Sequence, residues 1–140
     1  SAGGHLASTA SVQWSKQPDA QAARIDFSVL IYPVVSMVEG VTHQGSRNNL
    51  LGKAPSNELV DRFSNALQVS ENTPRTFIVH SFNDGAVPIR NTFEYIESLN
   101  RFKIECEAHL YRKGGHGYGM LPGTTDSWPA LLITWLKSLN

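Results

Sequence analysis

The stretch Thr76-Phe-Ile-Val-His-Ser-Phe-Asn-Asp-Gly-Ala-Val-Pro88 begins as a short apolar run and ends as a loop that carries an acid. A segment with helical spacing of apolar residues follows, and the alternating run Ile104–Tyr111 then leads into Lys113-Gly-Gly-His-Gly-Tyr-Gly119. The predicted order is strand, acid loop, helix, strand and histidine loop. Because open α/β sheets hold their chemistry just beyond the carboxyl ends of the strands, we expect Asp84 and His116 to meet at one edge of a sheet.

A carboxylate followed by a histidine is two thirds of a hydrolytic triad, and the nucleophile then precedes both. The chain opens with Ser1-Ala-Gly-Gly-His5, in which small residues allow a tight turn that presents the serine hydroxyl. We predict that Ser1 is the nucleophile, His116 its base and Asp84 the group that orients the base. The backbone N–H of Ala2 is the predicted oxyanion donor. Two other interpretations of Ser1 remain open: a flexible overhang, and a terminal nucleophile that uses its own α-amine as base.

The rest of the chain continues the alternation of strands and helices. Residues 24–32 predict a buried strand, and residues 34–55 are a long connection that we expect to be a loop or lid insertion. A helix is predicted after Ser56, with its apolar face continuing as far as Leu67. The final helix is predicted to start at residue 126 or 127. This alternation predicts an α/β fold with a parallel sheet and flanking helices, in one domain that spans residues 1–140.

Several other side chains of chemical interest are given structural roles. His80, at the end of a buried strand, is expected to be a hydrogen-bonded structural group, and Cys106 a small residue on the apolar face of its strand. His43 has no spaced partner and is expected to be a surface histidine instead of a metal ligand. The tryptophans of the last helix, Trp128 among them, are expected to pack in the core.

Composition excludes several classes of partner. The 12 basic and 12 acidic residues balance, so neither nucleic acid nor a membrane surface is predicted to bind. No apolar run approaches the roughly 20 residues that span a bilayer. The single cysteine excludes an internal disulfide. We expect no metal and no cofactor, and the cellular compartment stays open.

The same motifs also resemble a known family. Ser1-Ala-Gly-Gly-His-Leu-Ala7 resembles the nucleophile elbow of α/β-hydrolase-fold serine esterases of the acetyl esterase/lipase group. The segments 79–88 and 111–119 resemble the acid and histidine loops of that group. The segments 32–37, 42–47 and 50–55 are similar to bacterial carbohydrate esterases related to acetyl xylan and feruloyl esterases.

This resemblance covers essentially the whole chain. It implies the C-terminal half of an α/β-hydrolase fold, a three-layer arrangement with Ser1, Asp84 and His116 as the triad and with no metal or organic cofactor. The implied activity is that of a serine carboxylesterase that removes acetyl or other short acyl groups from a small-molecule or carbohydrate ester. A peptidase or dienelactone hydrolase of the same fold is an alternative. Another alternative is a truncated domain without activity that serves as an assembly or binding unit.

The chain departs from the family pattern in two places. Asn83 stands where many relatives carry aspartate, which we interpret as a neutral difference. The first half of the fold, with the loop that supplies most of the oxyanion hole, has no counterpart in these residues. We therefore expect this chain by itself to be weakly active or inactive, and we expect another chain segment or a second copy in a homo-oligomer to cover the exposed edge of the sheet.

Overall fold

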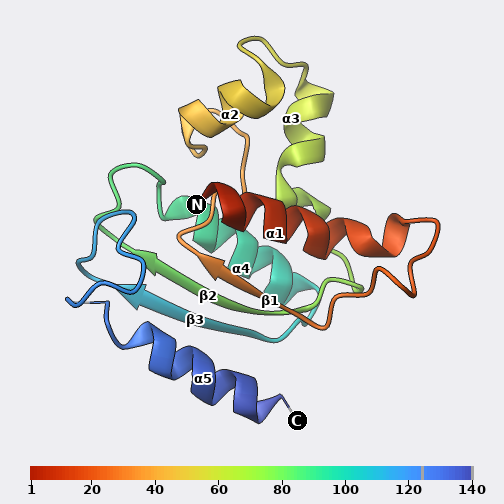
Figure 1. Ribbon diagram of the computed structural model, residues 1–140. Coiled ribbons are helices and arrows are strands. Elements are labelled where there is room, and N and C mark those ends of the chain that lie inside the picture. Colours follow the sequence, from red (N-terminus) through yellow and green to blue (C-terminus); the bar gives the residue numbers. More distant parts are fainter. Residues whose placement is uncertain (124, 140) are drawn as a thin grey trace.

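A parallel sheet is the centre of the computed structural model, which describes residues 1–123 and 125–139. Its strands are β1 (Phe27–Ile31), β2 (Arg75–Ser81) and β3 (Cys106–Tyr111), paired in the order β1-β2-β3 (Figure 1). Phe27 lies opposite Arg75, and Thr76 lies opposite Cys106. The predicted parallel α/β sheet is confirmed, and all the strands end on the same side of the molecule.

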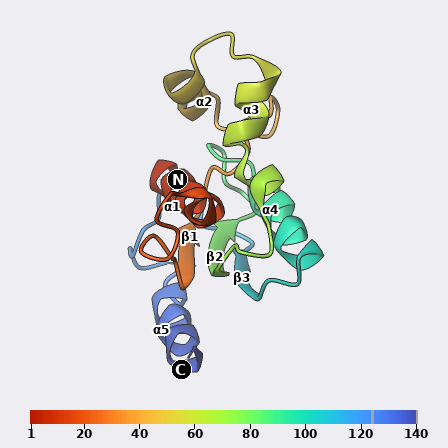
Figure 2. The ribbon, with the colours of Figure 1, turned by 90° about the vertical axis from the view of Figure 1, so that its right-hand side faces the viewer.

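Helices cover both faces of this sheet. Helices α1 (Ala2–Gln13) and α4 (Arg90–Arg101) lie on one face, and α5 (Trp128–Ser138) lies on the other (Figure 2). The short helices α2 (Gln44–Leu51) and α3 (Asn57–Phe63) project beyond α1 and α4, away from the sheet. The arrangement confirms the predicted three-layer architecture.

Strand β2 is the middle strand of the sheet, and the helices on the two faces bury its side chains. Alternate side chains of a strand point to opposite faces, so Ile78 enters the cluster under α1 and α4, while Phe77 joins the cluster under α5. Trp128 and Trp135 belong to this second cluster, and their side chains are 7% and 2% exposed. Their predicted role in the core is confirmed.

The region expected to be a loop contains a helix. Residues 44–51 form α2, whose first turn is capped by His43: its Nδ1 accepts a hydrogen bond from the Ser46 N–H at 3.2 Å. His43 therefore stabilises a helix end. Because none of the α2 residues is buried, this segment has no periodic pattern of apolar residues, and the sequence analysis did not predict the helix.

The helix predicted after Ser56 is present but shorter than expected. Ser56 Oγ accepts from the Leu59 N–H at 3.3 Å, as expected for the cap. The helix ends at Phe63, and a 3₁₀ turn (Asn65–Gln68) follows, in which Leu67 is 61% exposed. The extension of the apolar face to Leu67 was therefore wrong. The buried Asn65, whose N–H donates to Val35 O at 2.7 Å, holds the chain in this turn instead of a continued helix.

Both outer strands of the described sheet are less buried than β2. Ala108 of β3 is exposed, although alternation predicted an apolar inner face; the strand has only β2 beside it. Cys106 is half-buried, and burial raises the pKa of its thiol to about 11. The other edge of the described sheet is β1, where Phe27 is 42% exposed. No helix in the described part of the chain is long and apolar enough to cross a membrane.

Candidate active site

Asp84 lies in the loop after β2, where its carboxylate is completely buried. Its Oδ1 accepts hydrogen bonds from the backbone N–H groups of Ala86 at 2.9 Å and Val87 at 2.8 Å. Burial by itself raises the pKa of this carboxyl group. The hydrogen bonds from Val87, His116 and Ala86 outweigh burial, so the pKa of Asp84 lies below its ordinary value and the group is a carboxylate at neutral pH.

His116 lies in the loop after β3 and reaches this carboxylate. Its Nδ1 is 2.6 Å from Asp84 Oδ2, and its side chain is 24% exposed. Because an ionised carboxylate only accepts hydrogen bonds, Nδ1 carries the proton and a neutral His116 has its lone pair on Nε2. The backbone turns at Gly115 (φ 67°) and Gly117 (φ 75°), conformations that glycine adopts without steric cost. The structure thus brings together two of the three predicted triad residues.

Asn83 fastens the histidine loop to the acid loop. Its side-chain Oδ1 accepts hydrogen bonds from the N–H groups of Gly114 at 2.9 Å and Gly115 at 3.0 Å. Asn83 therefore positions the loop that carries His116, and because only its acceptor oxygen is used, an aspartate could make the same two contacts, in line with our interpretation of a neutral difference. A sequence pattern alone does not indicate it, since the two loops are about thirty residues apart along the chain.

Tyr32, directly after β1, lies against the ring of His116. The two rings meet edge to face with centroids 4.7 Å apart, and the Tyr32 hydroxyl accepts from the Gly119 N–H at 3.2 Å. Its φ of 39° is unusual for a residue with a side chain and is sustained by these contacts. Sequence reasoning missed Tyr32 as a site residue. Its position just past the end of a strand was the available signal.

Ser1 precedes α1, whose first residue is Ala2. The Ser1 carbonyl accepts hydrogen bonds from the N–H groups of His5 at 3.0 Å and Val34 at 3.3 Å. This end of α1 lies on the same side of the molecule as the ends of the strands (Figure 1). Burial lowers the pKa of the Ser1 amine, and the charge of Asp84 opposes that shift.

The predicted nucleophile is not hydrogen-bonded to its predicted base. Within residues 1–123 and 125–139, no hydrogen bond joins the side chain of Ser1 to His116 or Asp84. The N–H of Ala2, in the first turn of α1, has no carbonyl partner within the helix and is available to a ligand. Such apo geometry often tightens only when substrate is bound.

Gly4 explains how α1 comes so close to the loop after β1. A Cβ atom at this position would lie 2.7 Å from Pro33 Cβ and 2.9 Å from Pro33 Cα. Only glycine permits this approach without movement of the helix. The sequence suggested that the small residues after Ser1 serve the turn; the structure shows that Gly4 also sets the distance between helix and loop.

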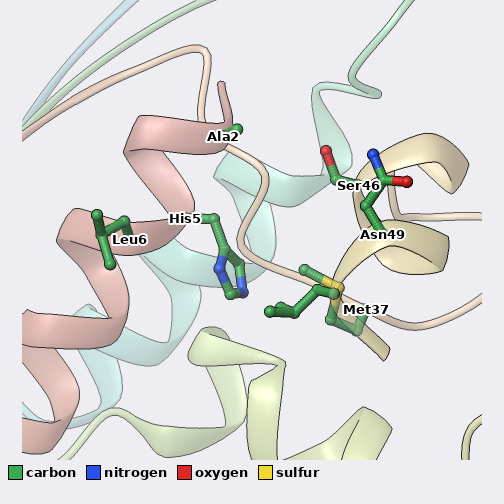
Figure 3. Close-up of a pocket in the computed structure, with 7 residues that line it drawn as sticks. Ala2, His5, Leu6, Met37, Ser46 and Asn49 are labelled. Atoms are coloured by element: carbon green, nitrogen blue, oxygen red, sulfur yellow. The ribbon is translucent and has the colours of Figure 1, made fainter. Parts of the chain in front are cut away.

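A cavity of about 340 Å³ lies next to Ala2, between α1 and α2 (Figure 3). Its walls come from the two helices and from the connection before α2. Its lining residues are Ala2, His5, Leu6, Met37, Ser46, Asn49 and Leu50. His5 is held in place by a hydrogen bond of 2.9 Å between its Nε2 and Phe63 O. Part of the predicted insertion thus faces the helix that begins at the predicted nucleophile.

The strand order, the flanking helices and the acid and histidine loops define a domain of the α/β-hydrolase fold. Residues 1–139 match the prolyl oligopeptidase family, so the chain belongs to that family. The family resemblance expected from the sequence is thus confirmed at the level of the fold and of the esterase relatives described next.

Two curated relatives and one solved structure are especially similar. An acetylxylan esterase of Xylanibacter ruminicola is 35% identical over 99% of this chain, which covers 29% of that protein. An endo-1,4-beta-xylanase B of Butyrivibrio fibrisolvens is 32% identical over 84% of this chain, which covers 19% of that protein. The acetyl ester-xyloside bifunctional hydrolase of Caldicellulosiruptor lactoaceticus is 35% identical, with a TM-score of 0.89 over 99% of this chain and 54% of its own. The chain therefore spans less than a third of the curated relatives and about half of the solved structure.

Proposed function

We propose that this chain carries the nucleophile, acid and base of a serine carboxylesterase that removes acetyl or other short acyl groups from carbohydrate esters. The observation that supports this most strongly is the contact of 2.6 Å between His116 Nδ1 and the buried, ionised carboxylate of Asp84. This pair is the acid–base half of a triad. The acetyl-ester and xylan names of the relatives support the choice of substrate class.

In the proposed reaction, Ser1 Oγ attacks the ester carbonyl while His116 Nε2 takes its proton. Asp84 keeps Nδ1 protonated and stabilises the imidazolium that forms. The Ala2 N–H, at the positive end of α1, donates to the oxyanion. His116 then gives the proton to the leaving alcohol. Water, deprotonated by His116, attacks the acyl-enzyme, and His116 returns that proton to Ser1 Oγ as the acid leaves.

We further propose that the insertion at 34–55 covers the substrate. Its helix α2 forms one wall of the cavity next to Ala2, which offers space for one side of an ester. We also propose that the outer edge of β1 is covered, in the working protein, by further chain or by a second copy. Loss of one oxyanion donor lowers the rate about a hundred- to a thousandfold, so we expect the 140-residue chain alone to be slow.

The experiment that tests the triad is labelling with a fluorophosphonate, with the modified peptide identified by mass spectrometry. We expect an adduct on Ser1 that disappears in His116→Ala, since the serine reacts only when its base is present. A folded chain without an adduct, or with an adduct on another residue, would contradict the assignment. Ser1→Ala serves as the control for labelling elsewhere.

A peptidase is the second candidate, and the match to the prolyl oligopeptidase family favours it. The two activities are separated by giving one preparation both acetylated xylo-oligosaccharides and a proline-containing peptide. We expect acetate release and no cleavage of the peptide. The reverse result would replace the esterase proposal by the peptidase. Binding of either substrate that is unaffected by Ser1→Ala, without any turnover, would indicate an inactive binding unit.

A further inference from the structure

His80, at the end of β2, is buried and hydrogen-bonded as predicted, and one of its partners is the proposed catalytic acid, Asp84. Its side chain is completely buried, with Nε2 3.1 Å from Asp84 Oδ2 and 3.1 Å from Val87 O, and with Nδ1 2.7 Å from Thr92 Oγ1. His80 and His116 therefore contact the same oxygen of Asp84, Oδ2.

These contacts determine the tautomer of His80. A backbone carbonyl only accepts hydrogen bonds, so the nitrogen beside Val87 O, Nε2, carries a proton. Burial lowers the pKa of His80 more than the nearby Asp84 carboxylate raises it, so the ring is neutral at neutral pH. Nδ1 is then an acceptor, and the Thr92 hydroxyl donates to it.

The carboxylate of Asp84 is consequently held by four N–H groups, of which the single Nε2–H of His80 is shared with Val87 O. Oδ1 receives the N–H groups of Ala86 and Val87, and Oδ2 receives the imidazole N–H groups of His80 and His116. A carboxylate with both oxygens held in this way has a single orientation. The two contacts to His80 and His116 also differ in length, 3.1 Å against 2.6 Å, so His116 makes the stronger one.

We propose that His80 is a positioning residue: as the neutral Nε2–H tautomer, it orients the Asp84 carboxylate so that Oδ2 holds His116 with its proton on Nδ1. The inference deepens the proposed function and rests on it, because the orientation of His116 matters to catalysis only if His116 is the base. Its geometry is nevertheless measurable without any turnover.

The first measurement is histidine nitrogen NMR on the unaltered 140-residue chain at neutral pH. One-bond and long-range ¹H–¹⁵N correlations distinguish the two neutral tautomers and the cation. We expect His80 as the Nε2–H tautomer and His116 as the Nδ1–H tautomer. A His80 that is cationic, or protonated on Nδ1, would overturn the proposal whatever the activity of the chain.

The second measurement compares two amide substitutions at the same buried position. In His80→Gln, the amide NH₂ reaches the place of Nε2 and replaces the donor to Asp84. In His80→Asn, the shorter amide reaches only the place of Nδ1, towards Thr92. We expect His116 to stay in the Nδ1–H tautomer in the Gln variant and to become a mixture of tautomers in the Asn variant. Equal tautomer populations in both variants would overturn the proposal.

Kinetics of acetate release then link the position of His116 to the reaction. Loss of a hydrogen bond to a charged group corresponds to a kcat about ten- to a hundredfold lower, so we expect that loss in His80→Asn, with little change in KM and with recovery in His80→Gln. A folded His80→Asn protein with unchanged kcat would overturn the proposed role. If the unaltered chain releases no acetate and its Ser1 takes up no fluorophosphonate, the proposed function fails and the NMR comparison decides the positioning alone.

Discussion

Two neighbouring glycines of α1 provide a matched test of how the helix is seated. Gly3 and Gly4 both lie within Ala2–Gln13, so alanine gains the same helix propensity at either position, up to about 0.8–1.0 kcal/mol. A Cβ atom at Gly3 meets nothing within 4 Å, whereas one at Gly4 lies 2.7 Å from Pro33 Cβ. Comparing Gly3→Ala with Gly4→Ala therefore separates the steric cost at Gly4 from the gain in helix propensity that both variants share.

The expected magnitudes follow from these contacts. Gly3→Ala is expected to raise the free energy of unfolding by up to about 1 kcal/mol. Gly4→Ala adds an overpacking cost of about 1–3 kcal/mol, because Pro33 is a rigid ring with its backbone 2.9 Å from the new atom. We therefore expect Gly4→Ala to be less stable than Gly3→Ala by about 1–3 kcal/mol.

The assay is urea unfolding followed by tryptophan fluorescence and by far-ultraviolet circular dichroism, with the slope m checked for equality among the variants. Fluorophosphonate labelling of Ser1 is measured on the same samples, since a displaced α1 also displaces Ser1 and Ala2. We expect slower labelling in Gly4→Ala alone. Equal stability of the two variants, or greater stability of Gly4→Ala, would refute the close seating of α1 on Pro33.

The remaining predictions concern the histidine loop, the pH dependence of stability and a helix cap. Asn83→Ala removes two partly exposed hydrogen bonds worth about 0.5 kcal/mol each, so we expect the rate of fluorophosphonate labelling of Ser1 to fall a few times. Asn83→Asp keeps an acceptor oxygen and is expected to label at nearly the rate of the unaltered chain. Equal labelling rates in all three proteins would contradict the role of Asn83. Burial lowers the pKa of His5 and His80 below 6.5, so the unfolded state binds more protons and the free energy of unfolding falls as the pH drops below that value. Urea unfolding at pH 7.5 and 5.5 checks this. His80→Gln is expected to show a smaller fall in the free energy of unfolding than the unaltered chain. The pKa of Asp84 is depressed, so its contribution to stability is present above its ordinary value of 3.8 and is lost as the pH falls through its lower folded value, which acid unfolding of Asp84→Asn against the unaltered chain will measure. Ser56→Ala removes the cap of α3 and is expected to destabilise the protein by about 0.5–1 kcal/mol, with Ser56→Asp as the control that keeps an acceptor.

The sequence by itself determined the elements whose causes are local. The apolar run before Asp84 and the alternation before His116 predicted β2 and β3. The helices predicted to start after Ser56 and at residue 126 or 127 begin at Asn57 and Trp128. Because parallel strands end at one edge of a sheet, the same patterns also predicted that Asp84 and His116 would meet, and their contact confirms it.

Only the tertiary structure decided which side chains hold that pair in place. The Asn83 hydrogen bonds, the ring of Tyr32 and the contact of His80 with Asp84 each join chain segments through space or through a turn whose geometry no periodicity encodes. Helix α2 escaped prediction for a related reason: it buries none of its residues and begins with a histidine cap. Hydrophobic patterns report burial on a regular element, whereas polar positioning depends on directional contacts that exist only once the chain is folded.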